Sequence, residues 1–352
     1  MNKAFIIAAD KITNGAGNLN HSRALEKSIE LLGVSIDTLS IDPLRADWHR
    51  PEQPDSFRSG CAPIEALAEA LARIQAGTQA VVIHGQDYIK SDYSRAERQK
   101  MMAVYGDGYP LTKAYTELSF EFIQQQGITA DTFKQYAEQL FENHRRSYLA
   151  SVTNTEAAEL PDERWYKPVT ELFRGVDCAN PVVDFCGRLL ICSEELLNKL
   201  GINKTHASEI KSVGLARLAE DGQTQIPAIA SYQHLKQAYE QACREAKVDF
   251  AQTFHAGNAL LDTYTCYPVV PMAFLLNSGL IKQLDALPEF LQSANITVTG
   301  GMNLARGAWN NPALNGLITM HQRLILGDKK IGLVHGNGGL GYRQGVAILG
   351  VA

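Results

Sequence analysis

The sequence lacks a long apolar run, a surplus of basic residues and paired cysteines. No uninterrupted apolar stretch reaches about 18 residues, so no membrane-spanning helix is expected. The net charge of -5 and the absence of Lys/Arg runs argue against nucleic-acid binding. The 6 cysteines are dispersed without a CxxC pair, which argues against a zinc ribbon or a secreted disulfide scaffold. The N-terminus has no signal-peptide core, and a cytoplasmic protein is expected.

Nucleotide-binding signatures are missing too. Neither GxGxxG nor GxxxxGK[ST] occurs at a strand-to-helix turn, which disfavours a Rossmann or P-loop enzyme. What is present is the composition of an ordinary folded protein, 45% hydrophobic and 20% charged. A length of 352 residues suggests about two domains.

Strand and helix patterns alternate along the chain, which predicts α/β layers with buried sheets. Strands are expected at residues 4–9, 80–85, 182–192, 209–218, 259–264 and 296–299 and at the C-terminus. Helices are expected at residues 22–32, 62–76, 111–126, 131–147, 232–247, 269–280 and 312–326. The similar order in the two halves suggests a duplicated fold. We expect one half in residues 1–95 plus 178–204, a helical loop subdomain in residues 96–177, and the second half in residues 205–352.

Glycine clusters mark the ends of two strands in the last third of the chain, ITVTGGMNLARGAWNN from Ile296 and IGLVHGNGGLGYRQGVAILG from Ile331. Glycine lets the backbone approach a ligand closely, so we expect the chemistry here.

Five segments, taken in order, resemble the thiolase superfamily. They are the helix that opens at Cys61, the strand ending IHGQD, the strand and helix VVDFCGRLLICSEEL, the turn TYTCYP and the two glycine-rich strand ends. The resemblance is closest to sterol-carrier-type thiolases and thiolase-like acetyl-CoA acetyltransferases. It implies two duplicated βαβαβαββ halves in five αβαβα layers, with an inserted helical loop domain that forms part of an acyl-CoA cleft.

Cys61 precedes a helix that begins with Ala62 and Pro63. The positive end of the helix dipole is expected to lower the pKa of its thiol. The family's acylated cysteine occupies this helix N-terminus, and Cys61 matches it to within one residue. The alternative is an unreactive cysteine in the capping region.

Cys266 lies in a turn between a strand and a helix, where a side chain can face a cleft. The resemblance implies an acid/base role at the substrate's α-carbon. The alternative is a cysteine that only fills the turn. Tyr264 stands where the family has a histidine, and its hydroxyl can still donate a hydrogen bond.

The first glycine-rich end departs from the Gly-His-Pro of ordinary thiolases, because Gly307 replaces the histidine. Asn310 and Asn311 could supply amide donors to an oxyanion or cap the next helix.

At the second glycine-rich end, His335 stands where biosynthetic thiolases have an acid/base cysteine, and the following glycines, Gly338 and Gly339 among them, offer N–H groups. A hydrogen-bonded structural histidine is the alternative. His84, after another strand, is a further candidate for lining the site.

The leading hypothesis is therefore a thiolase-type acyl-CoA C-acyltransferase, in which Cys61 carries the acyl group and His335 with Cys266 transfers protons. A catalytically degenerate subunit that binds thioesters or supports a partner enzyme is the alternative. No permanent cofactor or metal is expected, and a CoA or carrier-protein thioester is the expected substrate. The resemblance also implies a homodimer, or a thiolase-like or OB-fold partner protein.

Overall fold

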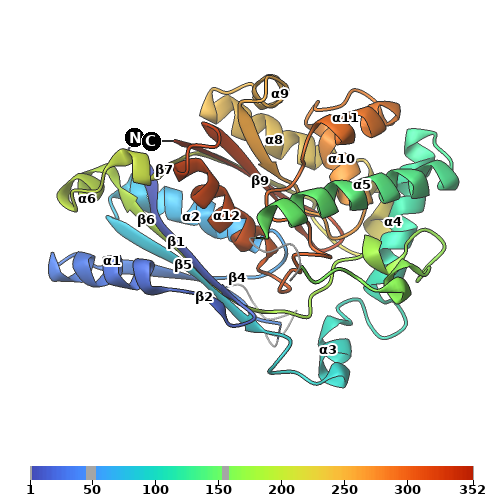
Figure 1. Cartoon of the computed structure of the whole chain (residues 1–352), viewed down its shortest axis with the longest axis horizontal. Coiled ribbons are helices and arrows are strands. Elements are labelled where there is room, and N and C mark those ends of the chain that lie inside the picture. The colour runs from blue at the N-terminus through green and yellow to red at the C-terminus, as the bar shows by residue number, and fades with distance from the viewer. Residues whose placement is uncertain (1, 45–52, 153–157, 352) are drawn as a thin grey trace.

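The computed structural model describes residues 2–44, 53–152 and 158–351. Within these ranges ten strands form one sheet in the order β4-β3-β5-β6-β1-β7-β10-β9-β8, with β2 paired to β1 (Figure 1). The strands of the first half are β1 (Ala4–Thr13), β2 (Ala16–Asn18), β3 (Ile36–Ile41), β4 (Ser56–Phe57), β5 (Ala80–Tyr88) and β6 (Asp184–Ser193). Those of the second half are β7 (Ser208–Arg217), β8 (Ala259–Asp262), β9 (Ile331–Gly338) and β10 (Arg343–Val351).

The two halves of the sheet repeat one pairing pattern. In the first half β3 runs parallel to β5, and β5–β6 and β6–β1 are antiparallel. In the second half β8 runs parallel to β9, and β9–β10 and β10–β7 are antiparallel. Among the described strands, the two halves of the sheet are joined where Phe5 and Ile6 of β1 pair with Glu209 and Ser208 of β7. The pattern agrees with the predicted duplication.

Helices lie between the strands and in one inserted segment. Those of the first half are α1 (Asn20–Leu31), α2 (Ala62–Ala76) and α6 (Glu194–Lys199). Those of the second half are α7 (Ile226–Ala230), α8 (Gln233–Ala246), α9 (Phe250–His255), α10 (Val269–Asn277), α11 (Leu287–Ser293) and α12 (Pro312–Ile325). Between β5 and β6 the chain forms α3 (Arg95–Met102), α4 (Leu111–Gln126) and α5 (Ala130–Ser151), grouped at one end of the molecule (Figure 1).

Three apolar clusters show that helices and sheet halves alternate in five layers. α1 and α6 cover the outer face of the first half, where Ile29 and Leu197 pack on Phe5. α2 and α12 lie between the two halves and contribute side chains to a cluster with strands of both (Figure 1). α8 and α10 cover the outer face of the second half. The predicted αβαβα architecture is confirmed.

Local signals in the sequence set the helix ends well. α2 spans the residues predicted for it, with Pro63 in its first turn and Gly77 at φ 116° as its C-cap. α4 likewise ends at Gly127, whose φ is 65°. Glycine tolerates this left-handed conformation, so the sequence marks both ends.

One predicted strand is wrong. Residues 296–299 form no strand, because a neighbouring carboxylate takes the hydrogen bonds that a ladder would use. Oδ1 of buried Asp262 accepts the backbone N–H groups of Val298 (2.9 Å) and Thr299 (3.1 Å). It also accepts the Thr297 hydroxyl at 2.6 Å. The segment is thus tied to the end of β8 as a loop.

Candidate active site

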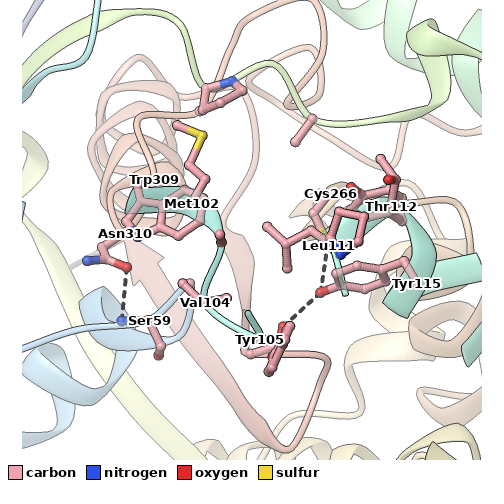
Figure 2. Close-up of a pocket in the computed structure, with 18 of the residues that line it drawn as sticks. Ser59, Met102, Val104, Tyr105, Leu111, Thr112, Tyr115, Cys266, Trp309 and Asn310 are labelled. Carbon is pink, nitrogen blue, oxygen red and sulfur yellow. Dashed lines mark hydrogen bonds between the residues drawn. The ribbon is translucent and has the colours of Figure 1, made fainter. Parts of the chain in front are cut away.

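A cavity of about 590 Å³ lies between the α3–α4 segment and five loops. The loops precede α2, precede β6, follow β8, precede α12 and connect β9 to β10. Figure 2 shows Cys266 and Tyr115 on one side of the cavity and Trp309 and Met102 on the other.

Most of the wall is apolar, and polar groups gather in one part of it. The apolar residues are Met102, Ala103, Val104, Pro110, Leu111, Ala179, Pro181, Met302 and Trp309. The polar ones that matter most are Ser59, Tyr105, Tyr115, Tyr264, Cys266, Asn310 and Asn337. A largely apolar pocket with a few fixed polar groups is the usual form of a small-molecule site.

Cys266 is the cysteine of the cavity wall, presented by the turn between β8 and α10. Its Sγ donates to the hydroxyl of Tyr115 at 3.4 Å. Burial raises the pKa of Cys266 to about 12, although its hydrogen bond with Tyr115 acts in the opposite direction. Burial also raises the pKa of Tyr115 well above its ordinary value. Both groups are therefore protonated at neutral pH, and the Tyr115 ring stacks on Tyr267 at 4.0 Å between centroids.

The hydroxyl of Tyr264 lies beside Gly60, next to the N-terminus of α2. A β-carbon built on Gly60 would overlap both Oη of Tyr264 and the carbonyl oxygen of Asn337. The phenol thus fills the space that a side chain at position 60 would need. Burial raises the pKa of Tyr264 well above its ordinary value, so it offers a neutral O–H donor.

Asn310 holds the loop before α2 in place. Its Oδ1 accepts the N–H of Ser59 at 3.1 Å, and its Nδ2 donates to the carbonyl of Asp42 at 2.7 Å. Ser59 has a φ of 118°, a conformation that costs a non-glycine residue about 1–3 kcal/mol. The Ser59 hydroxyl in turn accepts the N–H of Cys61 at 3.1 Å (Figure 2 shows the Asn310–Ser59 bond).

Comparison of the structure with solved structures finds similar proteins. No protein-family model and no curated protein sequence matches the chain. A monomeric SCP2-thiolase-like protein type 1 from Mycobacterium smegmatis superposes with a TM-score of 0.72 at 18% identity, covering 99% of this chain and 77% of that one. The chain has a thiolase-like fold. The Ltp2-ChsH2(DUF35) aldolase matches with a TM-score of 0.63 at 14% identity, covering 99% of this chain and 98% of that one.

Within this thiolase-like fold, Cys61 does not have the environment expected of an acylated cysteine. Its side chain is 0% exposed, and the residue belongs to the central apolar cluster instead of the cavity wall. A β-carbon on Gly345 of β10 would lie 2.8 Å from Sγ, so the thiol faces the sheet. Burial, followed by the charge of Glu65, raises the pKa of Cys61 well above its usual value. The expected lowering by the helix dipole is therefore wrong, because desolvation outweighs it.

His335 lies behind the cavity wall with both ring nitrogens in hydrogen bonds. Nδ1 accepts the backbone N–H of Tyr264 at 3.4 Å, and Nε2 bonds Oε1 of Gln344 at 2.8 Å. The ring stacks on Phe274 at 4.6 Å. Burial lowers the pKa of His335 to about 4. A neutral imidazole with both nitrogens occupied does not suit the predicted role of a general base.

His84 is the counterpart of His335 in the first half of the fold, since each precedes the glycine near the end of a corresponding strand. The predicted lining role is wrong because of strand alternation: Ile83 faces the central layer, while His84 faces the outer side with Val82. Its Nε2 lies 3.6 Å from Sγ of Cys186.

The two asparagines before α12 differ in role. Asn310 lines the cavity, whereas Asn311 points toward β5, where a β-carbon on Gly85 would overlap its Oδ1. Asn311 makes no side-chain capping bond to α12, and its amide has no hydrogen-bond partner among the described residues. The expected capping is therefore not found.

The glycines near the cavity are closely packed. Gly339 lines the cavity at φ 61° and presents its carbonyl to the Tyr115 hydroxyl at 2.8 Å. Gly338 packs against Ser59, whose Oγ would lie 2.7 Å from an added β-carbon. At Gly307 a β-carbon would lie 2.8 Å from Cγ of Pro312, so there is no free space there for a larger side chain.

Tyr115, Asn337 and Trp309 were not predicted as site residues. Tyr115 comes from the middle of α4, and nothing in the local pattern separates it from other buried helix positions. Asn337 stands inside the second glycine cluster, so its polarity among glycines was an available signal.

A membrane-spanning helix was not expected from the sequence. In the part of the chain that the structure describes, none of the helices has the length and apolar character that a membrane span requires.

Proposed function

We propose that the chain binds an acyl thioester in this cavity and makes or breaks the carbon–carbon bond next to the thioester carbonyl without a covalent acyl-enzyme. The observation that carries the proposal is the placement of the two cysteines. Cys266 lines the cavity with its S–H directed at Tyr115, while the thiol of Cys61 is buried against β10.

Cys266 is the group that exchanges a proton with the α-carbon. The Tyr264 hydroxyl, at the positive end of α2, donates to the thioester oxygen as negative charge develops there. In cleavage of a β-hydroxyacyl thioester, the Cα–Cβ bond breaks and the hydroxyl proton leaves to water. The α-carbon takes the proton of Cys266, which water replaces.

Two observations favour carbon–carbon bond chemistry without an acyl group on Cys61. Acyl transfer through Cys61 requires its thiol to leave the central cluster and to ionise against a raised pKa. An aldol-type reaction needs no such nucleophile, and one structural neighbour of this chain is an aldolase.

Deuterium exchange tests the proposal. The protein is incubated in D₂O with acetyl-CoA and, separately, octanoyl-CoA, and exchange at the α-carbon is followed by mass spectrometry. Wild type and Cys61→Ala should exchange at similar rates, and Cys266→Ala should lose about 10²-fold or more. Cys192→Ala, another buried cysteine, controls for the loss of a thiol. An acyl adduct on Cys61, or full activity in Cys266→Ala, contradicts the proposal.

The second candidate is a thioester-binding subunit that depends on a partner. It draws on the neighbour that is a complex of Ltp2 with ChsH2(DUF35) and on the raised pKa of every cysteine in and around the cavity. Binding of acetyl-CoA by calorimetry, with exchange only after a copurifying protein is added, would favour it. Exchange by the isolated chain would reject it.

A further inference from the structure

A chain of buried hydrogen bonds connects the Tyr264 backbone to the hydroxyl of Tyr115. From the His335 ring it passes through Gln344, whose Nε2 donates to Oδ1 of Asn337 at 2.8 Å. Nδ2 of Asn337 then donates to Oη of Tyr115 at 3.3 Å. Each side chain along the path is at most 3% exposed, so water does not compete for these bonds.

One end of the chain fixes the histidine tautomer. The backbone N–H of Tyr264 can only donate, so Nδ1 of neutral His335 accepts and its proton resides on Nε2. Nε2 therefore donates to Oε1 of Gln344, and this bond sets the orientation of the Gln344 amide.

A second backbone group requires the same orientation. The carbonyl of Gly341 can only accept, and it lies 2.7 Å from Nε2 of Gln344. The remaining hydrogen of that nitrogen goes to Oδ1 of Asn337, which turns the Asn337 N–H₂ toward Tyr115. The backbone N–H of Tyr264 and the carbonyl of Gly341 thus require the same donor and acceptor at each hydrogen bond between His335 and Asn337.

A third anchor acts at Tyr115. Its single hydroxyl hydrogen goes to the carbonyl of Gly339 at 2.8 Å, so toward Asn337 and Cys266 its oxygen accepts. The partner on the cavity side, Cys266, has to be the donor and is held as a thiol.

We propose that His335 is a positioning residue: as the neutral Nε2–H tautomer it holds the oxygen of Gln344 and, together with the carbonyls of Gly341 and Gly339, aims the Tyr115 oxygen at the S–H of Cys266. The acid role of Cys266 that follows rests on the proposed function. Its S–H bond breaks as the new C–H bond forms at the α-carbon, the sulfur keeps the electron pair, and water returns the proton. Before the reaction Cys266 therefore carries the proton that bond cleavage requires.

Two substitutions at His335 separate positioning from base catalysis. His335→Gln retains an N–H donor near the Nε2 position, whereas His335→Leu retains none. Cleavage of a β-hydroxyacyl-CoA, in which Cys266 acts as the acid, should stay within about fivefold of wild type in His335→Gln and slow at least about tenfold in His335→Leu. Equal, large losses in both variants would show that the imidazole itself acts as base and would overturn the proposal.

Alkylation of Cys266 by iodoacetamide, followed by peptide mapping between pH 7 and 10, is independent of activity. In His335→Leu the Gln344 oxygen loses its donor and Asn337 is no longer held against Tyr115, so the Tyr115 hydroxyl is expected to turn from the carbonyl of Gly339 to the Cys266 sulfur and stabilise the thiolate. The rate at a given pH should rise about tenfold, which corresponds to one unit of thiol pKa, about 1.4 kcal/mol. His335→Gln should match wild type within about twofold. Unchanged profiles in both variants would overturn the proposal.

Gln344→Met interrupts the same chain one residue further on and serves if His335→Leu does not fold. It should accelerate alkylation as His335→Leu does. If wild type shows no α-proton exchange, the proposed function fails, while the alkylation profiles still decide the positioning role.

Discussion

The hydroxyl of Tyr264 occupies the space that a side chain on Gly60 would need. This relationship places a phenol at the N-terminus of α2 and leaves the neighbouring Cys61 turned into the sheet. Even a methyl group at position 60 should therefore disturb the packing.

Gly60→Ala should lower the free energy of unfolding by about 1–3 kcal/mol, because the new methyl overlaps Tyr264 and the Asn337 backbone. The loss can be measured by urea denaturation. Gly108→Ala is the matched control, since nothing lies within 4 Å of its β-carbon. Adding Tyr264→Phe should restore part of the loss, and no restoration would argue against the overlap with the hydroxyl.

Asn310→Asp should destabilise the protein by about 1–3 kcal/mol, because a carboxylate oxygen replaces the N–H₂ that donates to the Asp42 carbonyl and two oxygens then face each other. The same change should slow α-proton exchange by releasing the strained Ser59 loop. Thermal unfolding measures the loss of stability. Asn258→Asp, at an exposed position, should change neither.

Tyr105→Phe removes a 2.6 Å hydrogen bond from the cavity wall to Asp221. Because the acceptor is a carboxylate, the bond should be worth about 1.5–3 kcal/mol. Hydrogen–deuterium exchange in residues 103–109 should accelerate roughly tenfold or more. Tyr166→Phe removes a hydroxyl from a side chain that is 41% exposed and should leave this segment unchanged. Equal protection in both variants would show that Tyr105 does not hold the wall.

Lys11 should make the stability rise at alkaline pH. Burial lowers the pKa of Lys11 to about 8, partly offset by the charge of Asp262, although its Nζ donates to Asn315 and Thr319. Between pH 8 and the ordinary value near 10.5 the unfolded chain binds the extra proton, so unfolding becomes less favourable as pH rises. Relative to Lys11→Met, wild type should gain about 2–3 kcal/mol between pH 8 and 10.

Urea denaturation at pH 7.5, 9 and 10 measures this difference between the two proteins. Lys236→Met, which changes a lysine whose side chain is 52% exposed, should run parallel to wild type over the same range. A constant difference between wild type and Lys11→Met would mean that Lys11 keeps its ordinary pKa.

Local sequence predicted most of the elements because their ends are marked by residues with special backbone preferences. Pro63 with Gly77 bounds α2, and Gly127 follows α4. Residues 296–299 had the composition of a strand, yet the N–H groups of Val298 and Thr299 bond to Asp262, 36 and 37 residues earlier. No local pattern contains that competing acceptor.

The sequence predicted only part of the site, because contacts between distant segments decide the rest. The turn with Tyr264 and Cys266 lies on the cavity wall, as its place between a strand and a helix suggested. Cys61 was chosen by its position beside a helix start, but a shift of one residue decides which position lines the cavity, and that is Gly60. Tyr115 comes from a helix whose contact with the turn depends on how the α3–α5 segment packs.

By itself, the sequence determined the α/β class, the duplicated halves and the turn that presents Cys266, because periodicity and turn chemistry act over a few residues. Only the tertiary structure decided which thiol reaches the cavity, that the imidazole of His335 is occupied at both nitrogens, and that Tyr115 bonds Cys266. Those outcomes depend on desolvation and on hydrogen bonds between segments far apart in the chain, and burial sets the protonation of each group only once the fold has enclosed it.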